Sequence, residues 1–194
     1  IPMGRDHNNQ IPLAVEYLEY LGTDQYSPAE FKKELFKYGL SFGVHASDEH
    51  AYVYISGLEE SLDKGVELLE HIIANAKPDQ EAYDKYVQKI MKDRSNAKED
   101  KNQILWRGMM NYGLYGEESS FRNIIPEEKL KNIEPAALTD LISGLYDYEH
   151  EIFYYGNRPT NKVKKLLSQQ HKVTSELKPV PEPTDYPLRD IDGN

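Results

Sequence analysis

The sequence predicts an α+β fold in which a mixed, mostly antiparallel sheet is covered by helices. Three observations lead to this prediction. Apolar side chains recur at helical spacing in several segments, a hairpin pattern occupies residues 41–56, and a further strand pattern occupies residues 151–156. The helical segments outnumber the strands, so the expected sheet is small for the helices that cover it.

The first two helices carry clear start and stop signals. Residues 10–21 place apolar side chains at intervals of one, three and four, and Gly22 is a natural C-terminal stop. Residues 27–30 read Ser-Pro-Ala-Glu, which combines an N-cap serine, a proline at the first helical position and a glutamate at the third. Gly39 is expected to end this second helix.

The hairpin and the later elements follow in order. Residues 41–46 and 51–56 are rich in aromatic and β-branched side chains, and the polar residues 47–50 between them favour a turn. Helical patterns then resume, with a strand before the last of them. The expected helices are 59–76, one opening at Pro78-Asp79, 102–112, two short ones opening at Pro126 and Pro135, and 160–169, with the strand at Glu151–Gly156.

The composition excludes several classes of protein. A net charge of −10 makes the chain a poor partner for nucleic-acid phosphates, which require a basic surface. There is no cysteine, so neither a disulfide framework nor a thiolate metal site is possible. No apolar run approaches the roughly 18 residues of a membrane helix, so no membrane span is expected.

One short motif gives the most information about function. Leu13-Ala14-Val15-Glu16-Tyr17, followed by Leu21-Gly22-Thr23, resembles the active-site helix of the pitrilysin/insulinase-type zinc metallopeptidases, the inverzincins. Their motif is H-x-x-E-H on a helix, followed shortly by Leu-Gly-Thr. Leu13 and Tyr17 take the places of the two zinc-binding histidines, and Glu16 keeps the place of the general base.

These replacements predict a domain that cannot bind zinc at this motif or cleave peptides itself. Zinc requires imidazole, thiolate or carboxylate ligands, and a leucine offers none of them. Without a metal-bound water, Glu16 has nothing to activate and is expected to be an ordinary helix residue. We therefore expect no catalytic residue, no metal ligand and no cofactor in this segment, with Leu13, Glu16 and Tyr17 marking a degenerate motif.

The resemblance covers most of the chain, from about residue 11 to residue 156, and includes Ser41-Phe42-Gly43 and Ser56-Gly57-Leu58-Glu59. In particular it resembles the third of four homologous domains in long bacterial members, where the resemblance implies that the first domain carries zinc and the third does not. It also implies a third ligand, a glutamate 70–80 residues beyond the motif. Residues 87–93 take that place here and contain Lys89 and Lys92 but no glutamate.

The resemblance also predicts the domain organisation. Family domains begin with strands ahead of the motif helix, whereas only Ile1-Pro2-Met3 precedes Gly4 here, so residues 1–171 are expected to form a domain that lacks its N-terminal strands. Residues 172–194 contain four prolines at 179, 181, 183 and 187 and are expected to be a linker toward a following domain. A domain without its N-terminal strands exposes a sheet edge and apolar surface, so the chain expressed alone is expected to aggregate or to show a broad thermal unfolding transition.

Two functions remain open from the sequence. The first is a non-catalytic structural domain that completes the peptide chamber of a zinc metalloendopeptidase, with zinc bound elsewhere in the parent protein. The alternative is a peptide-binding module of a wholly inactive homologue, similar to the non-catalytic subunit of a processing peptidase. Either function implies sister domains and peptides as partners. The resemblance favours the bacterial periplasm over the cytoplasm.

One further pair has ligand spacing. Glu67 and His71 are four residues apart on an expected helix and could share an ion, but they are expected to be a surface pair.

Overall fold

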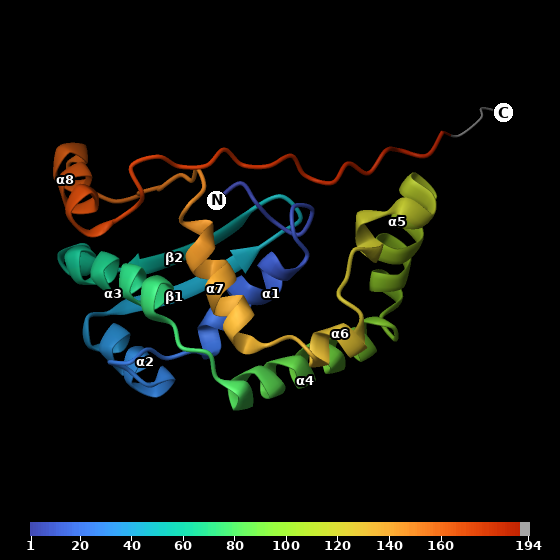
Figure 1. The fold of residues 1–194 in the computed structure, drawn as a ribbon, viewed down its shortest axis with the longest axis horizontal. Coiled ribbons are helices and arrows are strands. Elements are labelled where there is room, and N and C mark those ends of the chain that lie inside the picture. Colours follow the sequence, from blue (N-terminus) through green and yellow to red (C-terminus); the bar gives the residue numbers. More distant parts are fainter. Residues whose placement is uncertain (191–194) are drawn as a thin grey trace.

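The computed structural model describes residues 1–190 and contains a two-stranded antiparallel sheet with helices packed against it (Figure 1). Helices α1, α2 and α3 contact the strands, and α7 packs on α1. This arrangement agrees with the predicted α+β fold and its antiparallel sheet. The helices are α1 (Gln10–Tyr17), α2 (Pro28–Lys37), α3 (Leu62–Asn75), α4 (Gln80–Ala97), α5 (Met110–Tyr115), α6 (Glu127–Lys131), α7 (Pro135–Leu145) and α8 (Thr160–Gln170).

The predicted signals around α2 are confirmed in detail. The Ser27 hydroxyl accepts a hydrogen bond from the Glu30 backbone N–H at 3.3 Å, and the Glu30 carboxylate accepts one from the Ser27 backbone N–H at 2.9 Å. This capping box satisfies two N–H groups that a helix start leaves free. Gly39 has φ of +60°, a left-handed conformation that suits glycine and turns the chain from α2 into the first strand.

The predicted hairpin is also confirmed. Strands β1 (Leu40–Ala46) and β2 (Ala51–Gly57) pair antiparallel, with register from Leu40 opposite Gly57 to Ala46 opposite Ala51. Val44, Val53 and Ile55 pack against the main hydrophobic core, whereas Tyr52 and Tyr54 on the other face of the sheet are about half exposed. The alternation in the sequence therefore reflects one covered and one open face.

The predicted strand at Glu151–Gly156 is wrong as a paired strand. The segment belongs to no strand, and within residues 1–190 no backbone group of residues 151–156 bonds to another backbone group. A strand is defined by a ladder of backbone hydrogen bonds to a neighbouring strand, and β1 and β2 form a ladder with each other and none with this segment. The side-chain pattern suits a strand, but within residues 1–190 the backbone of this segment is not paired with any strand.

The helix expected at 102–112 begins as a π-helix over Gln103–Met109 and continues as α5. None of the residues in these two helices is buried. Figure 1 shows that this arm stands away from the sheet and is reached through α4. Its side chains include the only tryptophan of the chain, Trp106, which is 61% exposed.

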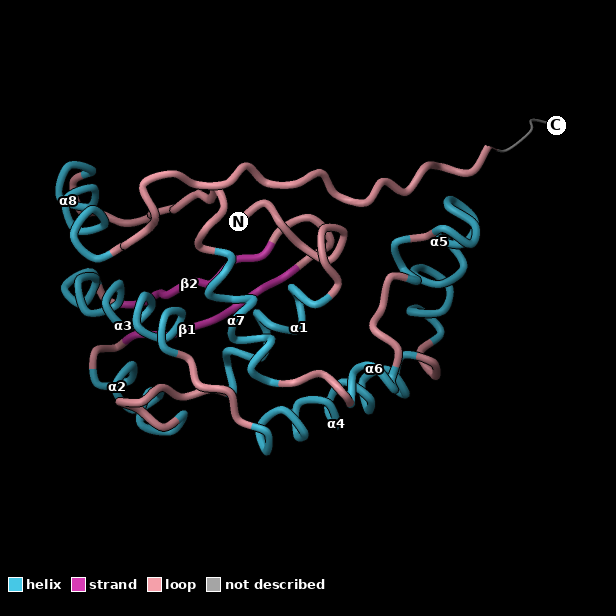
Figure 2. Tube along the Cα trace, viewed as in Figure 1, coloured by secondary structure: helices cyan, strands magenta, loops and turns pink. Residues whose placement is uncertain are grey.

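The C-terminal segment 172–190 has no helix or strand and crosses the molecule from α8 past the N-terminus to the arm (Figure 2). Backbone hydrogen bonds hold it at three places. Near Lys178, the Glu149 N–H donates to the Lys178 C=O at 2.9 Å and the Lys178 N–H donates to the Asp147 C=O at 2.7 Å. Farther along, the Thr184 N–H donates to the Asp6 C=O at 2.8 Å and the Arg189 N–H to the Leu114 C=O at 2.7 Å. Its role as a linker to a following domain remains a prediction, and residues 191–194 lie outside the described residues. Among the described helices, none combines the length and apolarity needed to cross a membrane.

Candidate functional site

The degenerate motif lies on α1, and two of its positions are part of the core. Leu13 and Tyr17 are 6% and 0% exposed and belong to the main hydrophobic cluster. The Tyr17 hydroxyl donates to the Asp79 C=O at 2.5 Å and accepts from the Asp79 N–H at 3.0 Å. Asp79 is the N-cap of α4, and its carboxylate accepts from the Ala82 N–H. Tyr17 therefore positions the start of α4.

Glu16, the retained position, is exposed at the edge of the same cluster. Its carboxylate accepts a hydrogen bond of 2.8 Å from the Tyr86 hydroxyl of α4. Tyr86 is 2% exposed, and burial raises the pKa of its phenol, with the neighbouring Glu16 carboxylate adding to the shift. The phenol is therefore a fixed donor at neutral pH and holds the Glu16 carboxylate in place.

Aromatic side chains fill the junction of α1 and α4. Tyr17 packs edge-on against Tyr83 at 5.5 Å between ring centroids, and Tyr20 packs on Tyr86 at 5.0 Å. Tyr83 also donates to the Leu130 C=O at 2.6 Å, and burial raises its pKa to about 12. Each phenol that lies deep in this junction has a defined acceptor, as buried tyrosines require.

The α4 positions that face the motif are Tyr83 and Tyr86, slightly earlier than the stretch 87–93 considered from the sequence. Lys89 is exposed, pairs with Asp93 at 3.0 Å, and has a raised pKa because of that bond. Its ammonium also lies close enough to Glu16 for the carboxylate to contribute to this shift. Lys92 is exposed on the same helix.

The donor set at this junction does not fit zinc. A leucine, two tyrosines and one glutamate supply a single carboxylate, and that carboxylate already accepts from Tyr86. Across residues 1–190 no three His, Cys, Asp or Glu side chains are grouped so that they could hold a metal ion. The chemistry of a metal-bound water cannot therefore be assigned to α1.

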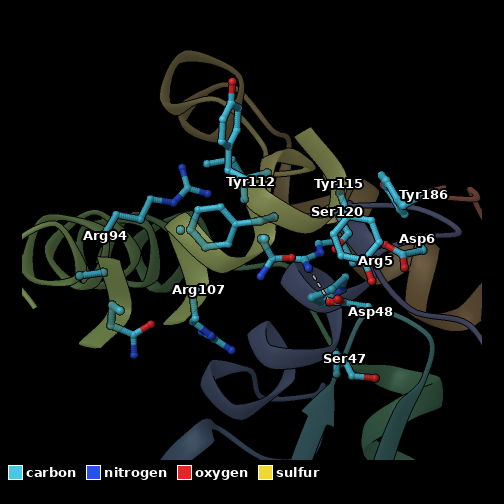
Figure 3. Close-up of a pocket in the computed structure, with 18 of the residues that line it drawn as sticks. Arg5, Asp6, Ser47, Asp48, Arg94, Arg107, Tyr112, Tyr115, Ser120 and Tyr186 are labelled. Carbon is cyan, nitrogen blue, oxygen red and sulfur yellow. Dashed lines mark hydrogen bonds and ion pairs between the residues drawn. The ribbon is translucent and has the colours of Figure 1, made fainter. Parts of the chain in front are cut away.

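A large open cavity of about 2330 Å³ lies between the arm and the part of the molecule that contains α1 and the hairpin (Figure 3). Glu16 reaches its wall, and acidic side chains outnumber basic ones around it. The acidic lining residues are Asp6, Glu16, Asp48, Glu49, Glu127, Glu182 and Asp185, the basic ones Arg5, Arg94, Lys98 and Arg107, and the aromatic ones Tyr112, Tyr115, Phe121 and Tyr186.

Two of these acidic groups lie together at the hairpin end of the cavity. Asp48 pairs with Arg5 at 2.5 Å, whereas one carboxylate oxygen of Asp6 is buried without a hydrogen-bond partner among the described residues. Desolvation raises the pKa of Asp6, and the nearby Asp48 and Glu49 carboxylates add to the shift while Arg5 opposes it. The wall therefore holds negative charge that the protein itself compensates only in part.

A partly buried polar network was not foreseen from the sequence. Glu70 of α3 accepts from the Tyr146 hydroxyl at 3.0 Å and contacts the His171 ring nitrogen Nδ1 at 2.8 Å. The other ring nitrogen of His171 lies 2.8 Å from Nε2 of His150. These residues come from three separate parts of the chain, so no local spacing could have indicated the network.

The pair with ligand spacing does not form a shared site. Glu67 pairs with Lys64 at 2.6 Å, and the His71 ring lies 2.9 Å from the Thr23 hydroxyl instead.

Known proteins similar to this chain are peptidases and relatives of peptidases. The family model described as Insulinase (Peptidase family M16) matches residues 13–123, more than half of the chain. Subunit 1 of the human mitochondrial cytochrome b-c1 complex is 23% identical over 166 residues, which cover 86% of this chain and 35% of that protein. The chain thus spans about a third of the length of this relative.

Solved structures share the fold at low identity. A mutant of the ferredoxin protease FusC, in complex with Arabidopsis ferredoxin, has a TM-score of 0.72 at 14% identity, over 96% of this chain and 21% of that chain. An inactive M16 peptidase domain from Pseudomonas fluorescens has a TM-score of 0.60 at 13% identity, over 73% of this chain and 35% of that chain. Both similarities extend well beyond the motif helix.

Proposed function

Because this chain belongs to the insulinase family of peptidases (peptidase family M16), we propose that it is a non-catalytic domain of a zinc metallopeptidase. In this role it completes a peptide chamber, packs against sister domains and cuts nothing itself. The observation that carries the proposal is the Tyr17 hydroxyl, which bonds to both backbone groups of Asp79. A zinc-ligand position has become a structural support for α4.

Four further features support this role. Leu13 is buried in the core, and the Glu16 carboxylate is held by Tyr86. The chain spans only 21% of the FusC chain that it resembles, so a domain of a larger protein is a suitable description. The acidic cavity wall beside Glu16 suits a chamber that accepts peptides with basic side chains.

The test is a measurement of bound metal and of peptidase activity on the purified chain. After dialysis against zinc, we expect no stoichiometric zinc and no cleavage of a mixed peptide library. Tightly bound zinc at one ion per chain, or turnover that a chelator abolishes, would contradict the proposal.

A ligand-restoring series sharpens the test. The double variant Leu13→His/Tyr17→His restores two ligands, but two imidazoles without a third donor bind zinc weakly, so we expect a Kd above about 1 µM. Adding Tyr86→Glu places a carboxylate on the α4 position that faces the motif and is expected to tighten binding. Submicromolar affinity in the double variant would show that another group already serves as a third ligand. Circular dichroism of each variant checks that it is folded.

A second function is favoured by one observation. The human relative is named as a subunit of the mitochondrial cytochrome b-c1 complex and not as a peptidase, so the family name alone does not imply cleavage. The alternative is a peptide-recognition module of a wholly inactive homologue. The sequence upstream of this segment in the same polypeptide distinguishes the two, because an intact H-x-x-E-H there selects the enzyme.

A further inference from the structure

We propose that His150 and His171 share a single proton and form a pH-sensitive clasp that fixes the C-terminal end of α8. The inference rests on which ring nitrogens carry hydrogen and does not depend on the proposed function.

Both histidines use Nδ1 as a donor. The His150 Nδ1 lies 2.6 Å from the Tyr148 C=O, which can only accept, so this nitrogen carries hydrogen. The His171 Nδ1 lies 2.8 Å from one oxygen of the Glu70 carboxylate, and the other oxygen accepts from the Tyr146 hydroxyl at 3.0 Å. An ionised carboxylate is also an acceptor only, so the His171 Nδ1 carries hydrogen as well.

These two donors leave a pair of bare nitrogens facing each other. A neutral imidazole with hydrogen on Nδ1 has only a lone pair on Nε2. The Nε2 atoms of His150 and His171 lie 2.8 Å apart, which is a hydrogen-bond distance and would be repulsive between two lone pairs. The contact therefore holds one proton more than two neutral rings supply.

The additional proton is assigned to His171. Its ring faces the Glu70 carboxylate, which favours a positive charge, whereas His150 donates to a neutral carbonyl. As an imidazolium, His171 donates from Nδ1 to Glu70 and from Nε2 to His150. Each polar group of the network then has a partner of the right kind.

The surroundings keep the two rings in place. The Tyr146 ring packs edge-on against both, with 5.7 Å between centroids to His150 and 5.4 Å to His171. The side chains of His171 and Glu70 are only 12% and 19% exposed. Burial raises the pKa of the Tyr146 phenol, and the Glu70 carboxylate adds to the shift, so the hydroxyl stays a donor.

The other charged groups around the pair are directed elsewhere. His71 of α3 contacts a threonine hydroxyl on the segment after α1. Asp147 pairs with Lys178 at 3.0 Å, and Lys172 donates to a backbone C=O of α8. Glu149 and the three lysines of α8 are exposed. The carboxylate of α3 described above is therefore the charge that acts most directly on the two rings.

The clasp has a defined pH dependence. Histidine changes its charge between about pH 5 and pH 8. The folded chain binds a proton here that the unfolded chain releases as the pH rises through this range, so the stability that the clasp adds is present at the acidic end and lost at the alkaline end. Once the proton is lost, the two lone pairs repel and the end of α8 is released.

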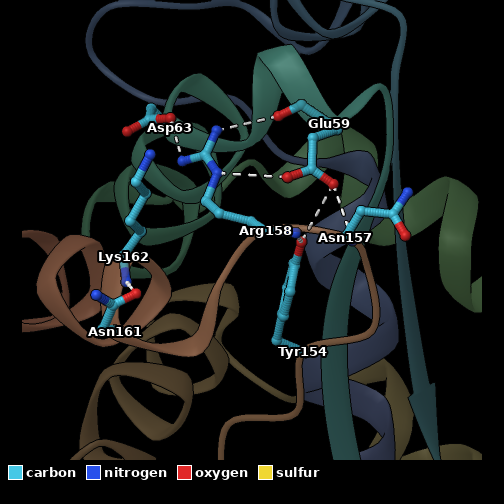
Figure 4. A network of polar contacts seen from close by, with 7 residues as sticks. All are labelled: Glu59, Asp63, Tyr154, Asn157, Arg158, Asn161 and Lys162. Carbon is cyan, nitrogen blue, oxygen red and sulfur yellow. Dashed lines mark hydrogen bonds and ion pairs between the residues drawn. The ribbon is translucent and has the colours of Figure 1, made fainter.

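The two ends of α8 should respond differently. At the N-terminal end, Arg158 pairs with Glu59 and Asp63 (Figure 4). Arginine keeps its charge in proteins, so these ion pairs persist where histidine titrates. The last turn ends at His171, whose N–H donates to the Leu167 C=O at 2.8 Å. Loss of the clasp should therefore expose the last turn and leave the first turn protected.

Amide hydrogen exchange of the full chain tests this difference. Protection factors remove the intrinsic effect of pH on exchange. Between about pH 6 and about pH 8, we expect protection at Gln170 and His171 to fall roughly fivefold or more, and protection at Val163 in the first turn to change less than about twofold. Equal protection of the last turn at both pH values would overturn the clasp.

His150→Gln is the diagnostic variant. A glutamine amide offers both a donor and an acceptor, so it can bond to the His171 Nε2 in either protonation state. The variant should lose the pH dependence of the last turn. His50→Gln, at an exposed histidine of the hairpin turn, is the matched control and should keep the dependence of the parent chain. The same pH dependence in both variants would contradict the shared proton.

Nitrogen-15 NMR of the imidazole rings in the parent chain detects the proton directly. At about pH 6 we expect hydrogen on both ring nitrogens of His171 and on Nδ1 alone of His150. A neutral His171 at this pH, or hydrogen on Nε2 of a neutral His150, would overturn the assignment. Excess EDTA should change neither the NMR result nor the protection factors. A change on adding the chelator would show that a metal ion, and not a proton, lies between the two nitrogens.

Discussion

Tyr17 is fully buried, and its hydroxyl satisfies both backbone groups of Asp79 where α4 begins. Replacing it by phenylalanine keeps the ring in the core but leaves the Asp79 N–H and C=O without this partner. We expect Tyr17→Phe to lower the free energy of unfolding by about 0.5–1.5 kcal/mol, the net contribution of a typical hydrogen bond. The loss is no larger because Asp79 is exposed to water and its C=O still accepts from the Tyr83 N–H at 3.0 Å. Urea denaturation followed by circular dichroism measures this change.

A matched control is available in the same aromatic group. The Tyr20 ring also packs on Tyr86, but its hydroxyl makes no hydrogen bond to protein among the described residues. Tyr20→Phe should therefore change stability by less than about 0.5 kcal/mol. If both variants lose the same stability, the Tyr17 hydroxyl is not the support of α4 that we describe.

Asp6 offers a prediction with a defined pH dependence. Its pKa is raised in the folded chain, mainly by desolvation, so between the ordinary and the raised pKa the folded state binds more protons than the unfolded state. Stability from this group is present at low pH and is lost as pH rises. Asp6→Asn should thus stabilise the protein at neutral pH, by less than about 1 kcal/mol because the group is partly solvated.

The gain should shrink as the pH falls through the raised pKa of the folded chain and then through the ordinary aspartate pKa of about 3.9, because below both pKa values Asp6 is neutral in the folded and the unfolded state. Denaturation curves at about pH 7 and about pH 4 measure both values. Asp24→Asn, a change at an exposed loop residue, provides the control for the loss of one negative charge. A gain for Asp6→Asn that is the same at both pH values would contradict this explanation.

Among the elements, those with local signals were predictable and those that depend on distant partners were not. The capping box of α2 and the hairpin follow from residues close in sequence. The segment 151–156 has a suitable strand pattern, but pairing depends on a neighbour that sequence spacing does not reveal. The same holds for the candidate site. The motif on α1 could be identified from the sequence, whereas Tyr86, its partner on α4, was identified only from the fold.

The attachment of α8 depends on such distant partners. Glu70 of α3 contacts Tyr146 and His171, and His171 is the C-cap of α8. Glu70→Ala removes both contacts and leaves the Tyr146 hydroxyl and the His171 ring without their acceptor. We expect faster hydrogen exchange throughout α8, and a loss of about 1–3 kcal/mol in local stability.

Glu67→Ala is the control on the same helix, since Glu67 pairs with Lys64 at the surface and makes no contact with α8 within residues 1–190. This variant should leave exchange in α8 unchanged. Unchanged exchange of α8 in Glu70→Ala would show that the helix is held by its apolar residues, Val163 and Leu166, alone.

At the scale of the whole molecule, apolar surface and free backbone edges remain uncovered. The arm that contains the π-helix and α5 buries none of its residues, although apolar side chains occur on most of its turns. A helix that is apolar all round is normally enclosed by other parts of a protein. Its exposed large apolar residues are Ile104, Leu105, Trp106, Met109, Met110, Tyr112 and Leu114.

We therefore expect the isolated chain to self-associate and to unfold over a broad temperature range, because exposed apolar surface and an open strand edge both favour aggregation. The double variant Trp106→Gln/Met109→Gln should reduce this association and leave the unfolding midpoint nearly unchanged, since 61% and 63% of these side chains are already exposed. Light scattering after size-exclusion chromatography and differential scanning calorimetry measure the two effects. Phe36→Gln removes an 85% exposed apolar side chain from α2 and is the control. It tests whether removing an apolar surface residue outside the arm reduces association by the same amount. A monodisperse parent chain with one sharp, cooperative transition would show that the arm and the β2 edge need no covering, and would count against its being a part of a larger assembly.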